Sequence, residues 1–396
     1  MNIVFVSGLI YPFEGAAANR YIAYSKGLSE LGHKVTFVLI QNQPEISGKF
    51  SIEGIDFFCG FPYSPDYERT NKFKRLMLYI RSIRNSMRII KTIHREKKID
   101  AMILLPVLLR DLIPYVLLAK SIKSKLLHER TEYPFMVGGG KEISDKLRLN
   151  IYLHIMLRQF DGIYVISNAL KKYFNDVLNS RVRVEVINMI VDSGRFNGVE
   201  LKPDNEFKYI AYCGTLNREK DGVDILVEAY CRSIDSGKIP FDVKLMLIGD
   251  FKSDAFRTSL QNMIDEKNCA GNIIFAGKME REKIPQVLNN ASALALARPY
   301  NKQSEGGFPT KLGEYLATGK PVIITDVGEI SLFLKDGYNA LIAKPGDIDS
   351  FSDKIAEVFA DYSRALVIGK NGRSLTEYEF NSLEQARKLA YFIESL

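Results

Sequence analysis

The stretch 304-SEGGFPTKLGEYLATGKPV-322 joins a sharp turn to a helical pattern and then to the start of an apolar run. Gly306 and Gly307 allow the turn, and Pro309 fits the first helical position, where its missing N–H costs nothing. Gly319 ends the helical pattern, and the apolar residues beyond it predict a buried strand. This order of loop, helix and strand is typical of α/β proteins with parallel sheets.

The same alternation of short apolar runs and helical patterns covers the chain and restarts near residue 208. It predicts parallel sheets with crossover helices. The predicted strands are Ile3–Ser7, Val35–Ile40, Met102–Leu105, Lys125–His128, Gly162–Ile166, Lys208–Cys213, Val243–Ile248, Ile273–Ala276, Ala293–Ala297, Pro321–Thr325 and Ala340–Ala343. The predicted helices are Ala18–Leu31, Asn71–Glu96, Asp221–Asp235, Lys283–Asn289, Pro309–Ala317 and Ile348–Asp361.

We therefore predict the α/β class, with two Rossmann-like domains and a deep interdomain cleft. Residues 1–196 are expected to form the N-terminal domain and residues 197–375 the C-terminal domain, while residues 376–396 form a helix that packs back towards the N-terminal domain. The polar segment Asn197–Phe207 links the two halves. Because ligands of open α/β sheets bind beyond the carboxyl ends of the strands, the loops after the strands are the candidate site.

The composition is that of a globular protein, with 46% hydrophobic and 26% charged residues. The four cysteines show no metal-binding spacing, and we expect reduced thiols in a cytoplasmic protein at Cys59, Cys213, Cys231 and Cys269. No signal-peptide pattern opens the sequence. Charged residues and prolines interrupt the longest apolar run, at residues 101–119, which indicates a strand and a core helix rather than a membrane span.

Positive charge is concentrated in the first half. Residues 1–196 hold 29 Lys and Arg against 18 Asp and Glu, a net charge of +11, whereas the remaining residues have a net charge of −4. This asymmetry indicates an anionic partner for the first half.

Part of this charge lies on one predicted helix. Its apolar stripe is expected at Leu76, Ile80, Ile83, Met87 and Ile90, and one flank carries Arg81, Arg84, Arg88, Lys91 and Arg95. A solvated surface is one interpretation. The other is association with an anionic membrane surface or a diphosphate-linked lipid, which would relieve the repulsion among the cations. No stacking aromatics accompany them, so nucleic acid is not an expected partner.

Two loops after strands carry candidate ligand-binding residues. The first, GLIYPFEGAAANR, holds Gly15, where small residues bring the backbone close to a ligand ahead of a helix N-terminus that favours an anion. A tight turn with a purely structural role explains this loop equally well. The second, YCGTLNREKDG, places Gly214, Arg218 and Lys220 after a strand, where two cations suit a diphosphate leaving group.

A third loop is the stretch quoted first. The backbone amides of Thr310 and Lys311 are expected to face an anion at the start of the helix, with the helix dipole behind them. Glu314 lies further along this helix. A carboxylate at that position is poorly placed for a phosphate and well placed for ribose hydroxyls.

In this order the motifs resemble those of the GT-B glycosyltransferases, specifically the large retaining family 4. The resemblance covers most of residues 160–360 and is carried by YCGTLNREKDGVDILVEAY, VKLMLIGD, IIFAGKM, ASALALARP and GGFPTKLGEYLATGKPVIITDVGEI with DGYNALIAKPGD. VINMIVDSGRF resembles the interdomain linker of the family. In the first half only the strand-one loop and YVISNALKKYF resemble the family, whose N-terminal domains bind diverse acceptors.

The resemblance implies that Lys220 binds the donor diphosphate and that Glu314 binds the ribose of a nucleotide sugar. It implies that Gly307 and Phe308 line the donor pocket. To the same donor site we assign Gly15, Gly214, Thr215, Arg298, Gly306, Pro309 and Thr310.

Two departures from the family pattern affect this assignment. Thr215 stands where the family often has an arginine, and Arg218 or Arg298 is expected to supply the missing cation. Gly306 stands where the family has its first glutamate, and Glu305 lies one residue earlier. Glu305 therefore either reaches the donor through a bulge or remains in solvent.

The predicted function is that of a retaining glycosyltransferase of the EC 2.4 class. It would move a sugar from a nucleotide-diphosphate sugar to a sugar or lipid-linked acceptor in cell-envelope polysaccharide or glycolipid synthesis, at the inner face of the membrane. The candidate catalytic residues are Lys220, Arg218, Glu305 and His128, and no metal or other cofactor is expected. For the segment around His128, a salt-bridge cluster is the alternative. A nucleotide-sugar epimerase and a non-catalytic GT-B-like binding protein are the rival functions.

Overall fold

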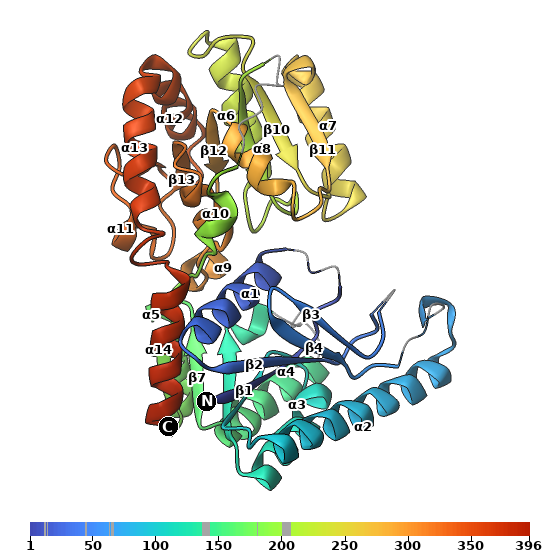
Figure 1. The fold of residues 1–396 in the computed structure, drawn as a ribbon. Coiled ribbons are helices and arrows are strands. Elements are labelled where there is room, and N and C mark those ends of the chain that lie inside the picture. Colours follow the sequence, from blue (N-terminus) through green and yellow to red (C-terminus); the bar gives the residue numbers. More distant parts are fainter. Residues whose placement is uncertain are drawn as a thin grey trace. The chain divides into compact units, whose positions relative to one another are not determined.

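The computed structural model describes residues 1–11, 13, 15–43, 46–62, 64, 67–136, 143–179, 181–199 and 207–396. Two compact units make up the chain (Figure 1). The N-terminal unit comprises Met1–Asn188 with Ser382–Leu396, and the C-terminal unit comprises Met189–Asn381. Residues 200–206 of the predicted linker lie outside the described residues. The domain limits at residues 196 and 375 stay predictions.

The N-terminal unit is built on a sheet whose described strands follow the order β3-β4-β2-β1-β5-β6-β7-β8. All neighbours are parallel except the antiparallel pair β3 and β4. The strands are β1 Asn2–Ser7, β2 Lys34–Leu39, β3 Lys49–Ile52, β4 Ile55–Cys59, β5 Ala101–Leu104, β6 Lys125–Arg130, β7 Gly162–Val165 and β8 Arg183–Val186. The longer helices are α1 Gly15–Glu30, α2 Lys72–Glu96, α3 Leu109–Ile122, α4 Ile143–Ile151, α5 Asn168–Leu178 and α14 Ser382–Ser395.

The last helix, α14, closes the N-terminal unit by packing against α1. The backbone of Ser382 and the side chain of Ala386 lie so close to Gly27 that no Cβ could be added there. Gly162 in β7 is covered in the same way by Phe392. Glycines at these two positions therefore allow the chain to return to its first half.

The C-terminal unit is built on a parallel sheet whose described strands follow the order β11-β10-β9-β12-β13-β14. Its strands are β9 Tyr209–Cys213, β10 Lys244–Ile248, β11 Ile273–Gly277, β12 Ala293–Leu296, β13 Val322–Thr325 and β14 Leu341–Ala343. Its helices are α6 Val223–Asp235, α7 Asp254–Glu266, α8 Ile284–Asn290, α9 Lys302–Gly306, α10 Lys311–Ala317, α11 Ile330–Phe333, α12 Ile348–Ala360 and α13 Tyr362–Ser374. The two sheets with their helices confirm the predicted α/β class with two Rossmann-like domains.

Two expectations about local structure were wrong. A disulfide joins Cys231 in α6 to Cys269, where the sequence predicted reduced thiols, because the packing of α6 and α7 brings residues 38 apart in sequence together. In α2, Leu76 is exposed, and of the predicted stripe only Ile90 is buried. The buried residues of the helix are Leu78, Ser82, Ser86, Ile90 and Ile93. Ser86 lies against Gly60, a close approach that larger side chains would prevent.

Candidate functional site

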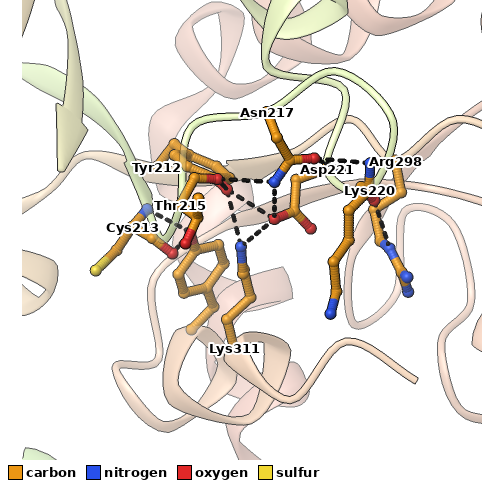
Figure 2. A network of polar contacts seen from close by, with 9 residues as sticks. Tyr212, Cys213, Thr215, Asn217, Lys220, Asp221, Arg298 and Lys311 are labelled. Atoms are coloured by element: carbon orange, nitrogen blue, oxygen red, sulfur yellow. Dashed lines mark hydrogen bonds and ion pairs between the residues drawn. The ribbon is translucent and has the colours of Figure 1, made fainter. Parts of the chain in front are cut away.

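A buried ion pair fixes the loop that follows β9 to helix α10 (Figure 2). Nζ of Lys311 lies 2.7 Å from Oδ2 of Asp221 and 2.9 Å from the hydroxyl of Tyr212. The same hydroxyl lies 2.8 Å from Oδ2 of Asp221. Burial acts to raise the pKa of Asp221, but the charge and hydrogen bond of Lys311 outweigh it, so this pKa is below its usual value. The sequence did not predict this pair.

Asn217 and Arg298 hold the backbone of Lys220 from two sides. Oδ1 of Asn217 accepts hydrogen bonds from the amides of Lys220, at 2.7 Å, and of Asp221, at 3.1 Å. On the other side, Nε of Arg298 donates to the carbonyl oxygen of Lys220 at 3.1 Å. The side chain of Lys220 is exposed and extends in the same direction as that of Arg298 (Figure 2). A fixed backbone therefore presents an ammonium group at the surface, beside a guanidinium that is itself buried.

Glycines allow the loops at the carboxyl ends of β9, β10 and β12 to approach one another. Gly214 has a φ of +150°, and a Cβ at this position would collide with Nζ of Lys311. Gly249 lies against the carbonyl oxygen of Gly214, and Gly222 lies against that of Ala297. Side chains at these positions would force the loops apart.

The remaining residues predicted in the β9 loop have different surroundings. Thr215 is exposed. Arg218 is also exposed, and its Nε lies 2.8 Å from Oδ2 of Asp224. Arg298 is buried, and its positive charge contributes to the low pKa of Asp221. Arg298 and Arg218 were the two cations predicted to replace the missing arginine. Arg298 holds the backbone of Lys220, whereas Arg218 forms a surface ion pair.

Glu314 in α10 forms a partly buried ion pair that the sequence did not predict. Its Oε1 lies 2.8 Å from Nη1 of Arg195, and the two side chains are 14% and 12% exposed. Nη2 of Arg195 also donates to the carbonyl oxygen of Arg281 at 3.0 Å. Burial, and after it the charge of Glu314, raises the pKa of Cys213 to about 12. The Glu314 carboxylate is therefore close to the end of β9, where the Lys220 loop begins.

Glu305 lies near the same loop, but its side chain has a different partner. Its Oε2 lies 2.7 Å from Nζ of Lys302, and the side chains of Glu305 and Lys302 are 35% and 68% exposed. Asn301, the N-cap of α9, donates from Nδ2 to the carbonyl oxygen of Glu219 at 2.7 Å. The backbone of α9 is thus tied to the Lys220 loop, whereas the Glu305 carboxylate is held in a solvent-exposed pair.

The chain between α9 and α10 contains the other residues predicted for the donor site. Gly306 ends α9, and Gly307 follows in an extended conformation. Phe308 is buried, with its ring edge-on to Phe333 at 5.5 Å, so it belongs to an aromatic cluster of the core. Pro309 is buried, and Thr310 is the N-cap of α10. Because α10 has only 7 residues, its dipole attracts an anion weakly.

Two predicted site residues lie in the N-terminal unit. Gly15 opens α1 and is exposed. His128 is fully buried in β6: Nδ1 donates to the carbonyl oxygen of Leu104 at 2.6 Å, and Nε2 accepts from the hydroxyl of Tyr152 at 2.8 Å. Burial, with a smaller effect from the charge of Arg130, lowers the pKa of His128 to about 3. Both ring nitrogens have partners in the core, which does not support the predicted catalytic role.

Two features are absent from the described residues. No three His, Cys, Asp or Glu side chains in the described ranges gather in a way that could hold a metal ion. Among the helices of the described part of the chain, none combines the length and apolar character that crossing a bilayer requires.

The sequence is similar to glycosyltransferases. Residues 207–361 match the family described as Glycosyl transferases group 1. The chain is 27% identical over 220 residues to the uncharacterized glycosyltransferase MJ1178 of Methanocaldococcus jannaschii, a match that spans 55% of each protein and thus about half the length of MJ1178. It is 27% identical over 256 residues to the lipopolysaccharide core biosynthesis mannosyltransferase LpsB of Rhizobium meliloti, covering 61% of this chain and 67% of LpsB.

The fold is similar to that of a solved structure with bound UDP and glucose. Anabaena Alr3699/HepE, in complex with UDP and glucose, superimposes with a TM-score of 0.70 at 15% identity and with full coverage of both chains. At this identity the likeness shows the fold, which is GT-B. The sequence matches show that the chain is similar to glycosyltransferases, and the structural match shows that it shares the fold of HepE.

Proposed function

We propose that this protein is a retaining glycosyltransferase that moves a sugar from a nucleotide-diphosphate sugar to an acceptor hydroxyl, in cell-envelope polysaccharide or glycolipid synthesis. The observation that carries the proposal is the arrangement at the end of β9. There the backbone of Lys220 is fixed while its ammonium is exposed, and the partly buried carboxylate of Glu314 lies nearby. The names of LpsB and of the HepE complex support a polysaccharide context and a UDP donor.

The chemistry follows from the charges of these residues. Lys220 and Arg298 bind the diphosphate and stabilise the negative charge that develops as the bond between the sugar C1 and the phosphate oxygen breaks. Glu314 accepts hydrogen bonds from the ribose hydroxyls. The acceptor oxygen bonds to C1 on the same face, and its proton passes to the leaving phosphate. In this scheme the cationic side chains, rather than a metal ion, balance the diphosphate charge.

A calorimetric titration of the native protein with UDP, GDP and their sugar derivatives tests the donor site. Glu314→Gln is expected to weaken nucleotide binding about 10-fold to 100-fold, because hydrogen bonds to a charged group contribute about 1.5–3 kcal/mol. Glu305→Gln is the matched control and should change the affinity less than about 5-fold, because its pair is exposed. Melting temperatures of both variants show whether the Glu314 variant still folds.

The outcomes separate the rival functions. Failure of the native protein to bind any nucleotide would refute the donor-site proposal and favour a non-catalytic protein. Conversion of a bound nucleotide sugar to an isomer in the absence of an acceptor would identify an epimerase. Equal losses in the two glutamate variants would assign Glu305 to the donor site as well.

We further propose that α2 binds the anionic surface of the inner leaflet. The five cations predicted on its flank are all exposed: Arg81, Arg84, Arg88, Lys91 and Arg95. Near the start of the helix, Phe73, Leu76 and Met77 are 72%, 54% and 40% exposed. Exposed apolar side chains beside a row of cations are typical of helices that lie on a membrane surface.

A vesicle flotation assay at low salt tests this proposal. Each cation near an anionic leaflet contributes about 1 kcal/mol, so Arg84→Gln with Arg88→Gln should lower binding to phosphatidylglycerol vesicles about 30-fold. The matched control replaces the exposed Lys252 and Arg257 of the C-terminal unit by glutamine, and it should bind like the native protein. Equal binding to phosphatidylcholine vesicles would contradict an electrostatic contribution.

A further inference from the structure

A cavity of about 590 Å³ lies in the N-terminal unit, at the carboxyl ends of β5 and β6. The described residues that line it belong to the segments 107–110, 134–135 and 145–152, together with Arg130 at the end of β6. Its volume is within the range of about 300–1,000 Å³ that is usual for small-molecule sites. The wall is largely apolar, and its charged members are Arg110, Arg130, Arg148 and Asp145.

Arg130 is the unusual member of this wall. It is only 4% exposed, and its Nη2 donates to the carbonyl oxygen of Glu132 at 3.1 Å. In the described part of the chain, its Nε has no hydrogen-bond partner and no carboxylate forms an ion pair with it. The preceding residue, Glu129, is instead paired with Arg20 at 2.8 Å. Burying a guanidinium without a counter-charge is costly, and an anionic ligand in the cavity would supply that charge.

The floor of the cavity holds Arg130 in place. Its guanidinium lies 5.7 Å from the ring centre of Tyr152, whose hydroxyl donates to Nε2 of His128. Because the pKa of His128 is lowered to about 3, chiefly by burial, the imidazole is neutral and adds no charge. Arg130 is therefore pre-positioned, and His128 acts on the cavity only through Tyr152.

The exposed edge of the cavity, here called the rim, carries two more cations and two apolar side chains. Arg148 and Arg110 are exposed, and each has a loose ion pair, at 3.8 Å to Asp145 and at 3.7 Å to Asp111. Long, exposed arginine side chains can turn towards an anion without a large cost. Leu108 and Phe135 line the cavity and are also exposed, so the apolar wall continues to the protein surface.

We propose that this cavity is the acceptor site and that it binds an amphipathic phosphate ester, with the phosphate on Arg130 and a hydrocarbon chain along the apolar wall. This inference rests on the proposed function, which requires a binding site for the acceptor. A planar guanidinium suits a phosphate because it can donate two parallel hydrogen bonds. The apolar wall and its open rim explain why a chain, and not the phosphate alone, occupies the site.

Calorimetry without a donor tests the site, with octyl phosphate, inorganic phosphate and octyl glucoside as probes. Octyl phosphate should bind most tightly, and Arg130→Gln should weaken it at least about 10-fold. Arg181→Gln is the matched control. Arg181 is exposed and precedes the edge strand β8, so it lies at the amino ends of the parallel strands, whereas the cavity lies at their carboxyl ends; its loss should leave the affinity unchanged.

Each alternative result overturns a defined part of the proposal. Equal affinities for inorganic phosphate and octyl phosphate would mean that free phosphate is the ligand. Equal affinities for octyl glucoside and octyl phosphate, or no effect of Arg130→Gln, would exclude an anion site. Because no carboxylate among the described residues pairs with Arg130, its replacement should not lower the melting temperature, and a marked fall would indicate a structural residue instead. UDP titration of the same samples distinguishes failure of this proposal from failure of the proposed donor site. Octyl phosphate binding without UDP binding would refute the donor site alone.

Discussion

Replacing Lys311 by methionine should destabilise the C-terminal unit more than any substitution of an exposed lysine. In the native protein Nζ lies 2.7 Å from Oδ2 of Asp221, and the two side chains are 14% and 5% exposed. Removing one member of a buried ion pair leaves the other charge uncompensated, at a cost of about 3–5 kcal/mol in the free energy of unfolding. Methionine retains most of the lysine stem, so the loss is mainly electrostatic. Asp221 would keep only neutral donors, the hydroxyl of Tyr212 and the amide of Asn217.

The pH dependence of this loss provides a second measurement. In the native protein the pKa of Asp221 is below its usual value, because Lys311 outweighs burial. Its contribution to stability is therefore present above the unfolded-state pKa of about 3.9 and is lost as the pH falls through the lower folded-state pKa. Without Lys311, the charge of Arg298 and the hydrogen bond of Tyr212 would still lower the pKa of Asp221, but burial would be less well opposed, so this pKa should rise from its native value. The folded variant would then bind a proton more readily, and its deficit should shrink between pH 7 and pH 4.

Urea unfolding followed by circular dichroism at both pH values measures these changes. Lys302→Met is the matched control: its pair with Glu305 has the same 2.7 Å separation but is largely exposed, so its loss should cost less than about 1 kcal/mol. The double variant Asp221→Asn with Lys311→Met should recover part of the stability, because the carboxylate that lost its partner is also removed. The reasoning would be refuted by a Lys311→Met loss no larger than that of the control, or by a loss that is independent of pH.

Two further substitutions test the geometry. Gly214→Ala should lower both the melting temperature and the affinity for UDP, because its Cβ would collide with Lys311 at a φ of +150°. Gly237→Ala is the control, because a Cβ there would lie in open space. The φ of +65° at Gly237 alone should cost about 1 kcal/mol, without a change in UDP binding. For His128, ring proton shifts measured by NMR should stay constant between pH 5 and pH 8, because its pKa is about 3. A titration near pH 6.5 would contradict the buried, neutral imidazole.

The sheets were predictable because parallel strands covered on both faces are continuous apolar runs. β1 and β13 are buried at every residue, and both were expected from their sequences. The hairpin of β3 and β4 was missed, although its signal is present. Glu53 and Gly54 both have positive φ, the requirement of a type I′ turn, but β3 lies at the sheet edge and shows no apolar run.

The candidate site was only partly predictable, because its scaffold depends on contacts between distant residues. Lys220 and Glu314 were found from motif resemblance. The ion pairs around them were not, since Asp221 and Lys311 are 90 residues apart and Arg195 and Glu314 are 119 apart. No local pattern of charge or hydropathy connects such positions. Only the packing of the strand ends brings them together.

The ion pairs of the two glutamates differ in solvent exposure, and therefore in how firmly each carboxylate is held before a ligand binds. The pair of Glu305 with Lys302 is mostly in solvent, where an ion pair contributes less than about 1 kcal/mol, so binding could release this carboxylate at little cost. The pair of Glu314 with Arg195 is mostly shielded, and Arg195 is also fixed by the carbonyl of Arg281, so separating it would cost several times more. Glu314 is therefore held in one position before a ligand arrives, with Arg195 as its anchor. A ligand that binds to Glu314 must contact the carboxylate without displacing Arg195. This requirement favours hydroxyl groups, which donate hydrogen bonds, over a cation that would compete with Arg195.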